Sequence, residues 1–285
     1  MSPLRQRMLD ALQLRGMAKR TQEAYIDAVA RLARHYGCSP DKLDSQQVQT
    51  YLLHLLRARG LSRSTVNQAG CAFRFLYGTV LKRSEVMQIP LGAPPQCLPE
   101  VLSREELARV FECAPHLKAR TFLMAAYGSG LRLSELCHLR VIDIDSAPDR
   151  MCLRVVQGKG GKDRYVPLPL DLLAVLRSYW REARPREWMF PASRDRSRAL
   201  DAKSAQRWWG VARDAAGISK HGGIHTLRHC YATHLLEGGV DLHSIGQWLG
   251  HRHLSTTTRY MHLVRPDASA GARREPLALL SALPH

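Results

Sequence analysis

The stretch from His225 to Tyr260 determines how the rest of the chain is interpreted. It reads HTLRH at 225–229, LGH at 249–251 and TRY at 258–260. No carboxylate lies between His225 and Arg228, and the stretch has no metal-ligand cluster of a usual spacing. Imidazole, guanidinium and phenol groups together suit chemistry on a phosphodiester better than chemistry on an acyl group, because guanidinium pairs well with phosphate oxygens.

Local signals predict that this stretch begins with a helix. His225 and Arg228 are three residues apart, which puts both side chains on one face of a helix. The opposite side is apolar, with Leu227, Tyr231 and Leu235 at helical spacing. The glycine pair that follows is expected to end the helix.

Two shorter helices are predicted next. One begins at an N-capping aspartate and ends at Gly250, and Ser255 caps another that carries Tyr260. His251 and Tyr260 are nine residues apart, so on one straight helix they would lie on roughly opposite sides. They meet in one site only if the chain breaks between them, and Gly250 with Ser255 favours such a break.

Composition points to a polyanionic partner. The chain has 285 residues, is 45% hydrophobic and carries a formal net charge of +17 with a pI of about 10.1. Residues 1–95 hold 14 Lys and Arg against 6 Asp and Glu, and the remainder is equally basic. We therefore expect both parts of the chain to contact the polyanion. The weaker alternative is a charge that serves only solubility.

Cysteine usage and hydropathy predict a cytoplasmic protein. The seven cysteines are scattered without a CxxC pair, as expected of reduced thiols. No run approaches the roughly 18 apolar residues of a membrane span. The polar N-terminal segment does not resemble a signal peptide. We expect no membrane association.

Residues 1–91 are predicted to form a compact helical unit. Helices are expected over 4–15, from Thr21 to Gly37, over 45–59 and from Ser62 onwards. Their polar faces carry the basic side chains Lys19, Arg20, Arg57, Arg59, Arg63 and Arg74. Each alone is most simply a solvated surface residue, but the net charge of this part of the chain favours contacts with phosphates.

Prolines separate this unit from a second one. Three prolines and a glycine make residues 92–101 an extended linker, because proline cannot continue a helix. The second domain is predicted over 102–265. The short apolar tail at 266–285 is expected to pack on its own domain or to dock onto a neighbouring molecule.

The second domain begins with a capping box formed by Ser103 and Glu106. Helices are predicted up to residue 113 and over 117–127. A glycine break at 128–130 then places Arg132 at the start of the next helix. The alternative interpretation of Arg132 is a surface arginine paired with Glu135.

Strands are predicted over 141–146, 151–156 and 163–168. The last two flank a glycine-rich turn that presents Lys159 at the tip of a hairpin. This turn lacks the spacing and the following helix of a nucleotide-binding loop. Further helices are expected over 170–184 and about 200–216.

Taken in this order, the motifs resemble the tyrosine recombinase (phage integrase) family, close to Xer-type and transposon integrases. The motifs are GLRxSEL around Arg132, GKG around Lys159, HxLRH at 225–229, LGH at 249–251, and Tyr260 nine residues later. The resemblance implies a mainly α fold with a small antiparallel sheet (α+β). It implies an N-terminal helical core-binding (SAM-like) domain and a catalytic domain that form a C-shaped clamp on DNA. The extra N-terminal arm-binding domain of many phage integrases is not expected.

The resemblance also implies a role for each residue of the motifs. Tyr260 is expected to attack a DNA phosphate and form a 3′-phosphotyrosyl bond. Arg132 and Arg228 would clamp the non-bridging oxygens, and Lys159 would protonate the departing 5′-oxygen. The remaining residues would support them: His225 and His251 by hydrogen bonds and proton transfer, Glu135 by orienting Arg132, and His229 from behind the site. Neither a metal nor another cofactor is implied.

The implied partner is double-stranded DNA, bound by a homotetramer in the synaptic complex and by a monomer or weak dimer before that. Lys162 and Arg164, beside the hairpin turn, are expected to contact DNA as well. Localisation would be cytoplasmic, at the nucleoid. The alternatives within this chemistry are a type IB-like relaxing topoisomerase and a non-catalytic DNA-binding protein. A metal enzyme is a weaker alternative, with ligands drawn from His225, His229, His234, His251 and His253.

Overall fold

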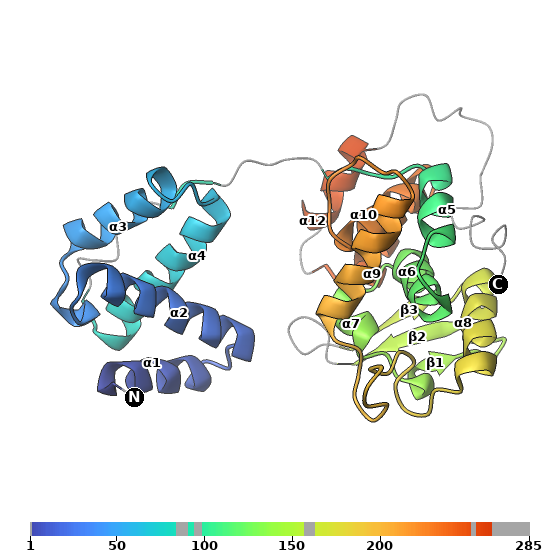
Figure 1. The fold of residues 1–285 in the computed structure, drawn as a ribbon, viewed down its shortest axis with the longest axis horizontal. Helices are drawn as coiled ribbons and strands as arrows, with labels where there is room; N and C mark the ends of the chain where they lie inside the picture. The colour runs from blue at the N-terminus through green and yellow to red at the C-terminus, as the bar shows by residue number, and fades with distance from the viewer. Residues whose placement is uncertain (1, 84–90, 94–98, 157–162, 252–254, 264–285) are drawn as a thin grey trace. The chain divides into compact units, whose positions relative to one another are not determined.

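The computed structural model describes residues 2–83, 91–93, 99–156, 163–251 and 255–263. The chain divides into two compact units, Met1–Cys97 and Leu98–His285, each with its own hydrophobic core (Figure 1). Both are mainly helical, and the C-terminal unit adds a small antiparallel sheet. The predicted fold class is therefore confirmed.

The N-terminal unit consists of α1 (Pro3–Leu14), α2 (Lys19–Tyr36), α3 (Ser45–Arg57) and α4 (Arg63–Arg74), with short 3-10 helix η1 (Pro40–Lys42) and π-helix η2 (Phe75–Val80). Thr21 does not cap α2, which begins two residues earlier, after Ala18. Gly37 ends α2 in the left-handed conformation, as predicted. Ser62 caps α4 by accepting a hydrogen bond from the Thr65 amide.

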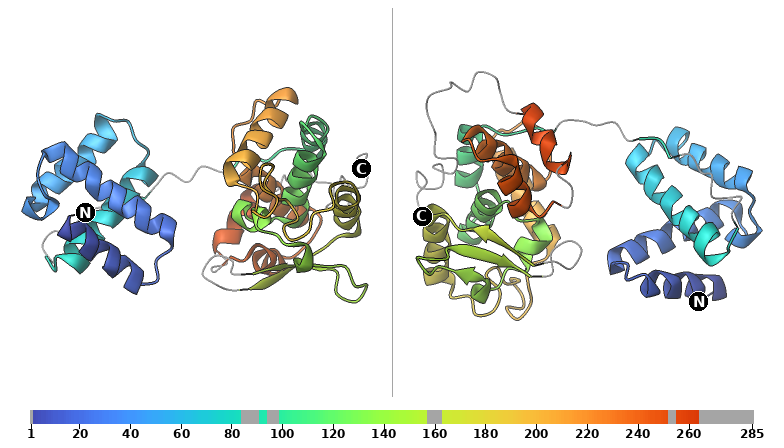
Figure 2. Two further views of the ribbon diagram at one scale, coloured as in Figure 1. Left: turned by 60° about the horizontal axis from the view of Figure 1, so that its bottom comes forward. Right: turned by 180° about the vertical axis from the view of Figure 1, so that it is seen from behind.

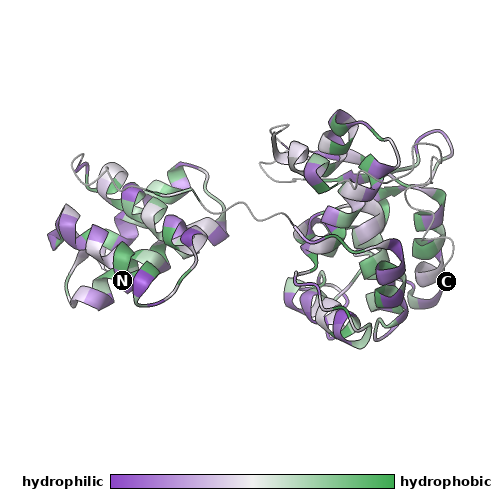
Figure 3. Ribbon diagram, turned by 90° about the horizontal axis from the view of Figure 1, so that it is seen from above, coloured by the Kyte–Doolittle hydropathy of each residue, from purple (hydrophilic) through white to green (hydrophobic). Residues whose placement is uncertain are grey.

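The predicted basic faces of this unit are only partly solvent-exposed. Lys19, Arg20, Arg57, Arg59 and Arg63 are exposed. Arg74, by contrast, is partly buried near the end of α4, with its Nε atom inaccessible to solvent. Arg74 is therefore less exposed than the solvated surface position that the sequence predicted, and its contact with DNA stays a prediction. Figure 3 shows hydrophilic and hydrophobic residues interleaved along these helices, as expected of amphipathic helices around one core.

Five helices of the C-terminal unit match the predicted ones closely. They are α5 (Arg104–Glu112), α6 (Leu117–Ser129), α7 (Leu133–Cys137), α8 (Leu170–Ala183) and α9 (Ala202–Ala215). Ser103 and Glu106 form the predicted capping box at α5. Helix α6 runs through Gly128 and ends only at Gly130, which is left-handed with φ of 59°.

The sheet is smaller than predicted. Strands β1 (Ile144–Asp145), β2 (Cys152–Val155) and β3 (Arg164–Pro167) pair antiparallel in sequence order, while residues 141–143 form 3-10 helix η4. The sheet lies beside α8 at one side of the unit (Figure 2). The predicted turn at 157–162, with Lys159 and Lys162, lies outside the described residues.

The last described elements are α10 (His225–Glu237), α11 (Leu242–Leu249), α12 (Ser255–Thr258) and 3-10 helix η5 (Arg259–Leu263). Asp241 caps α11 and left-handed Gly250 ends it, as predicted. The sequence predicted an amphipathic α10, but the helix is buried on nearly all sides. Arg228 is among its buried residues. Within the described residues, no helix is both long and apolar enough to span a membrane.

Helices α6 and α10 pack against each other through the end of α6. A Cβ atom added to Gly130 would lie 2.3 Å from the Cδ1 atom of the buried Tyr231 ring. Glycine is therefore required at this position for two reasons, its positive φ and this close approach. The carbonyl oxygen of Gly130 also accepts a hydrogen bond from Arg228.

We predict that Gly130→Ala lowers the free energy of unfolding by about 3 kcal/mol or more, since it combines left-handed strain with overlap in the core. Gly217→Ala is the matched control, because Gly217 is left-handed with φ of 67° but has nothing within 4 Å of an added Cβ. It should cost only about 1 kcal/mol. Urea unfolding followed by tryptophan fluorescence measures this unit alone, since all five tryptophans lie in it. Equal losses in the two variants would contradict this account.

Candidate active site

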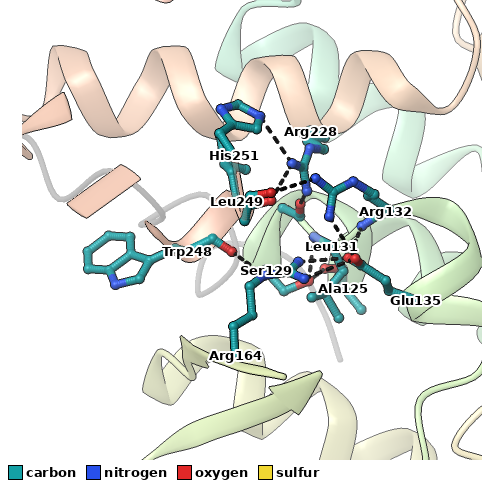
Figure 4. Close-up of polar contacts among 12 residues, drawn as sticks. Ala125, Ser129, Leu131, Arg132, Glu135, Arg164, Arg228, Trp248, Leu249 and His251 are labelled. Atoms are coloured by element: carbon teal, nitrogen blue, oxygen red, sulfur yellow. Dashed lines mark hydrogen bonds and ion pairs between the residues drawn. The ribbon is translucent and has the colours of Figure 1, made fainter. Parts of the chain in front are cut away.

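Two helix C-termini hold the side chain of Arg228. Its Nη1 donates a 2.6 Å hydrogen bond to the carbonyl of Gly130 after α6, and its Nη2 donates one of 2.6 Å to the carbonyl of Leu249 at the end of α11. The C-terminus of a helix carries partial negative charge and unsatisfied carbonyls, so it attracts a cation. Arg228 is only 7% exposed and is fixed between these two ends (Figure 4).

Arg132 reaches the same helix end from another direction. It is the N-cap residue of α7, and its Nη2 donates a 2.8 Å hydrogen bond to the carbonyl of Gly250. Its Nη1 donates a 2.8 Å hydrogen bond to Oε1 of Glu135, while its main-chain amide donates to Oε2. The alternative interpretation, a surface arginine paired with Glu135, predicted this ion pair correctly. It did not predict that the pair is largely buried or that Arg132 also bonds to Gly250. The bond to Gly250 places Arg132 beside Arg228 (Figure 4).

The charges in this cluster do not cancel. Burial alone would raise the pKa of the Glu135 carboxyl, but hydrogen bonds and charge from Arg164 and Arg132 outweigh it and lower that pKa to about 2. Burial, followed by repulsion from Arg132, lowers the pKa of Arg228 to about 10. A guanidinium rarely shifts this far, and here the main cause is the removal of its charge from water, with Arg132 adding repulsion. Three guanidinium groups meet here, and Glu135 pairs with two of them, so the formal charges of these four side chains sum to a positive value.

His225 and His251 both lie close to Arg228. Burial, and then the charges of Arg228 and Arg132, lower the pKa of His225. The Nε2 atom of His251 lies 3.2 Å from Nη2 of Arg228, and its Nδ1 atom lies 2.8 Å from the hydroxyl oxygen of Thr257. A guanidinium only donates, so Nε2 accepts, and in the neutral ring Nδ1 carries the proton and donates to Thr257.

Tyr260 joins this cluster through the predicted break in the chain. Helix α12 stops at Thr258, and η5 brings the Tyr260 ring to within 6.3 Å of the His251 ring, nearly parallel at 12°. The phenol oxygen lies 3.1 Å from Nδ1 of His229, the residue after Arg228. Tyr260 is 2% exposed, so it is covered in the free protein.

The histidines of the alternative metal site do not gather around one point in the described residues. His234 is buried and its Nδ1 atom lies 2.9 Å from the Tyr127 hydroxyl, while His229 and His251 face the partners given above. In the part of the chain that the structure describes, no group of three His, Cys, Asp or Glu could hold a metal ion. Lys159 and His253 lie outside that part.

The expectation that Arg164 contacts DNA does not agree with its surroundings. Its side chain is 12% exposed, and its three nitrogens donate to Glu135 and to the carbonyl of Trp248. Strand alternation contained the missed signal: Arg164 lies two residues before Val166 and therefore on the same, inward face of β3.

We predict that Glu135→Gln lowers the free energy of unfolding at pH 7 by roughly 3 kcal/mol. The Glu135 pKa is lowered from its ordinary value of 4.5 to about 2, so its contribution is complete above pH 4.5 and is lost as the pH falls toward 2. The gap between wild type and variant in urea unfolding should therefore narrow below pH 4.5. Glu182→Gln, at an exposed position on α8, is the control and should change neither quantity. A gap that stays constant with pH would refute the assignment.

Both units match known sequence families. Residues 100–265 match the phage integrase family, and residues 4–85 match the N-terminal SAM-like domain of phage integrases. A predicted integrase/recombinase of Sinorhizobium fredii is 40% identical over 265 residues, covering 92% of this chain and 85% of the relative.

A second relative and a solved structure agree with this. The tyrosine recombinase XerA of Thermococcus kodakarensis is 35% identical over 254 residues, covering 87% of this chain and 86% of the relative. The fold matches that of a lambda integrase tetramer bound to a Holliday junction, with a TM-score of 0.75 and 18% identity, over 94% of this chain and 78% of that one. The chain therefore belongs to the phage integrase family of tyrosine recombinases.

Proposed function

We propose that this chain is a site-specific DNA recombinase whose Tyr260 cleaves and rejoins strands through a 3′-phosphotyrosine intermediate, with exchange between two duplexes. One observation carries the proposal: Arg132 and Arg228 converge on one helix end, and the Tyr260 ring stacks on His251, which accepts a hydrogen bond from Arg228. A scissile phosphate supplies the anion that this cluster lacks.

The two arginines would act on the charge that develops at phosphorus. Attack by the phenol oxygen produces a pentacoordinate phosphorane with more charge on its non-bridging oxygens than the starting diester. Each guanidinium has five N–H donors, and the bonds described above use two of them in Arg132 and three in Arg228, the third being its bond to His251. The remaining donors would bind the phosphate in a fixed orientation, which favours the transition state.

Tyr260 would need both a proton acceptor and a change of position. An isolated phenol has a pKa of about 10 and is a weak nucleophile until it loses its proton. The imidazole of His229 already contacts the phenol oxygen. The pKa of His225 is lowered, which keeps the His225 ring neutral at pH 7 and able to accept a proton. Because Tyr260 is covered in the free protein, η5 would have to shift for the phenol to reach the phosphate.

The leaving group completes the proton balance. As the Tyr260–phosphorus bond forms, the bond from phosphorus to the 5′-oxygen breaks, and that oxygen takes up a proton. Lys159 is our candidate donor, on the strength of the family resemblance, since it lies outside the described residues. The reverse reaction, with a 5′-hydroxyl of another strand as nucleophile, rejoins DNA. The covalent bond conserves the energy of the diester, so neither a metal nor a nucleotide is needed.

The same proposal extends to partners. We infer that the chain binds double-stranded DNA with residues of both units, as a tetramer when two duplexes are paired and as a monomer or weak dimer before that. The related lambda integrase was solved as a tetramer on a Holliday junction, which supports this assembly. The exposed basic side chains of the N-terminal unit would contribute phosphate contacts. A cytoplasmic, nucleoid-associated location follows from that partner.

We predict that Tyr260→Phe abolishes covalent protein–DNA adducts but leaves DNA affinity within about twofold, because it removes only one oxygen from a packed ring. The DNA is a pool of fragments from the genome segment that carries the gene, and adducts are captured on filters under denaturing conditions. Tyr165→Phe is the matched control, since Tyr165 is 64% exposed on the outer side of β3. It should form adducts like wild type. Survival of adducts in Tyr260→Phe would show that the nucleophile is another residue.

We predict that Lys159→Ala slows cleavage of an ordinary diester by about 100-fold or more, because general acid catalysis contributes this much. A substrate with sulfur in place of the bridging 5′-oxygen should restore the rate to within about tenfold of wild type, since a thiolate leaves without protonation. Single-turnover adduct formation measures both rates. An equal defect on the two substrates would remove the acid role from Lys159.

A further inference from the structure

The carbonyls of Trp248, Leu249 and Gly250 each accept a hydrogen bond from a different arginine. Arg228 donates to Leu249 and Arg132 donates to Gly250, as described above. The third donor is Arg164, whose Nε lies 2.9 Å from the carbonyl oxygen of Trp248 (Figure 4). Arg164 begins strand β3, so this one bond joins the sheet to the end of α11.

Arg164 also holds Glu135 in a bidentate ion pair. Its Nη1 lies 2.9 Å from Oε1 and its Nη2 lies 2.7 Å from Oε2. Each carboxylate oxygen is thus shared, since Oε1 also accepts from Nη1 of Arg132 and Oε2 from the Arg132 amide. Arg164 takes the fork-to-fork geometry that a carboxylate offers to one guanidinium. Arg132 is left with a single side-chain bond to Glu135.

Packing around Arg164 is tight. An added Cβ at Gly250 would lie 3.0 to 3.2 Å from its Cδ, Nε and Cζ atoms, so its side chain runs directly past the left-handed turn that ends α11. The side chains of Arg164 and Glu135 are 12% and 7% exposed. The Arg164 guanidinium therefore links strand β3, helix α7 and the end of α11.

We propose that Arg164 is a positioning residue that acts through Glu135 and the end of α11 to hold Arg132 in the orientation that binds the scissile phosphate. This inference rests on the proposed function. Without Arg164, Glu135 is free to take Arg132 in a bidentate pair, which withdraws from the phosphate the donors that bind it. A misplacement of about 1 Å at such a group costs roughly 100-fold in rate.

The test compares Arg164→Met with Arg132→Met on two substrates. One is the diester cleaved by wild type, and the other carries a neutral methylphosphonate at the same position. We expect Arg164→Met to slow single-turnover cleavage of the diester by roughly 10- to 100-fold while DNA affinity and its salt dependence stay unchanged. On the methylphosphonate, which has lost the charge that the arginines bind, both variants should fall within about fivefold of wild type.

Controls separate the possible explanations. Arg177→Met, at an exposed position on α8, should behave like wild type on both substrates. Arg164→Lys keeps the charge without the fork, so it should show a smaller defect with the same recovery, and it serves if Arg164→Met does not fold. An equal defect on both substrates, or a loss of DNA affinity with a reduced salt dependence, would overturn the inference. If no diester DNA is found on which wild type forms a covalent adduct, the proposed function itself fails.

Discussion

Three guanidinium groups bound to three consecutive carbonyls at the end of α11 are the constraint on which the rest of this structure depends. The three guanidinium groups repel one another. Among the described residues, Glu135 is the carboxylate that pairs with two of them, Arg132 and Arg164. The helix end supplies the missing stabilisation, because its carbonyls and its dipole both favour cations. Such a cluster is costly in the absence of an anion and becomes favourable when a phosphate binds.

The ends of helices α6 and α11 place main-chain carbonyls where the arginines can reach them. Gly130 and Gly250 are both left-handed, which ends α6 and α11 with carbonyls turned toward Arg228 and Arg132. Helix α10 is buried on nearly all sides because it carries Arg228 into this junction and His229 to the tyrosine. The cost of burying the Arg228 guanidinium is offset by its hydrogen bonds to the ends of α6 and α11, so these two helices and α10 have little freedom to move apart.

Much of this arrangement was predictable from the sequence, because the signals are local. Glycine stops, N-caps and the capping box of α5 fixed most helix boundaries, and the order of the motifs indicated the family. The errors concern burial, which depends on partners distant in sequence. Arg164 was expected at a DNA surface but pairs with Glu135, 29 residues away, and Arg74 was expected to be exposed. The alternation of β3 indicates that Arg164 faces inward, but it does not identify Glu135 as the carboxylate that Arg164 meets.

A crystal structure of the protein on its DNA site, trapped with vanadate in place of the scissile phosphate, tests the central claim most directly. We expect equatorial vanadate oxygens within about 3.2 Å of guanidinium nitrogens of both Arg132 and Arg228, with the bonds of these arginines to Leu249 and Gly250 retained. Vanadate coordinated by other groups, with either guanidinium turned away from it, would contradict the account.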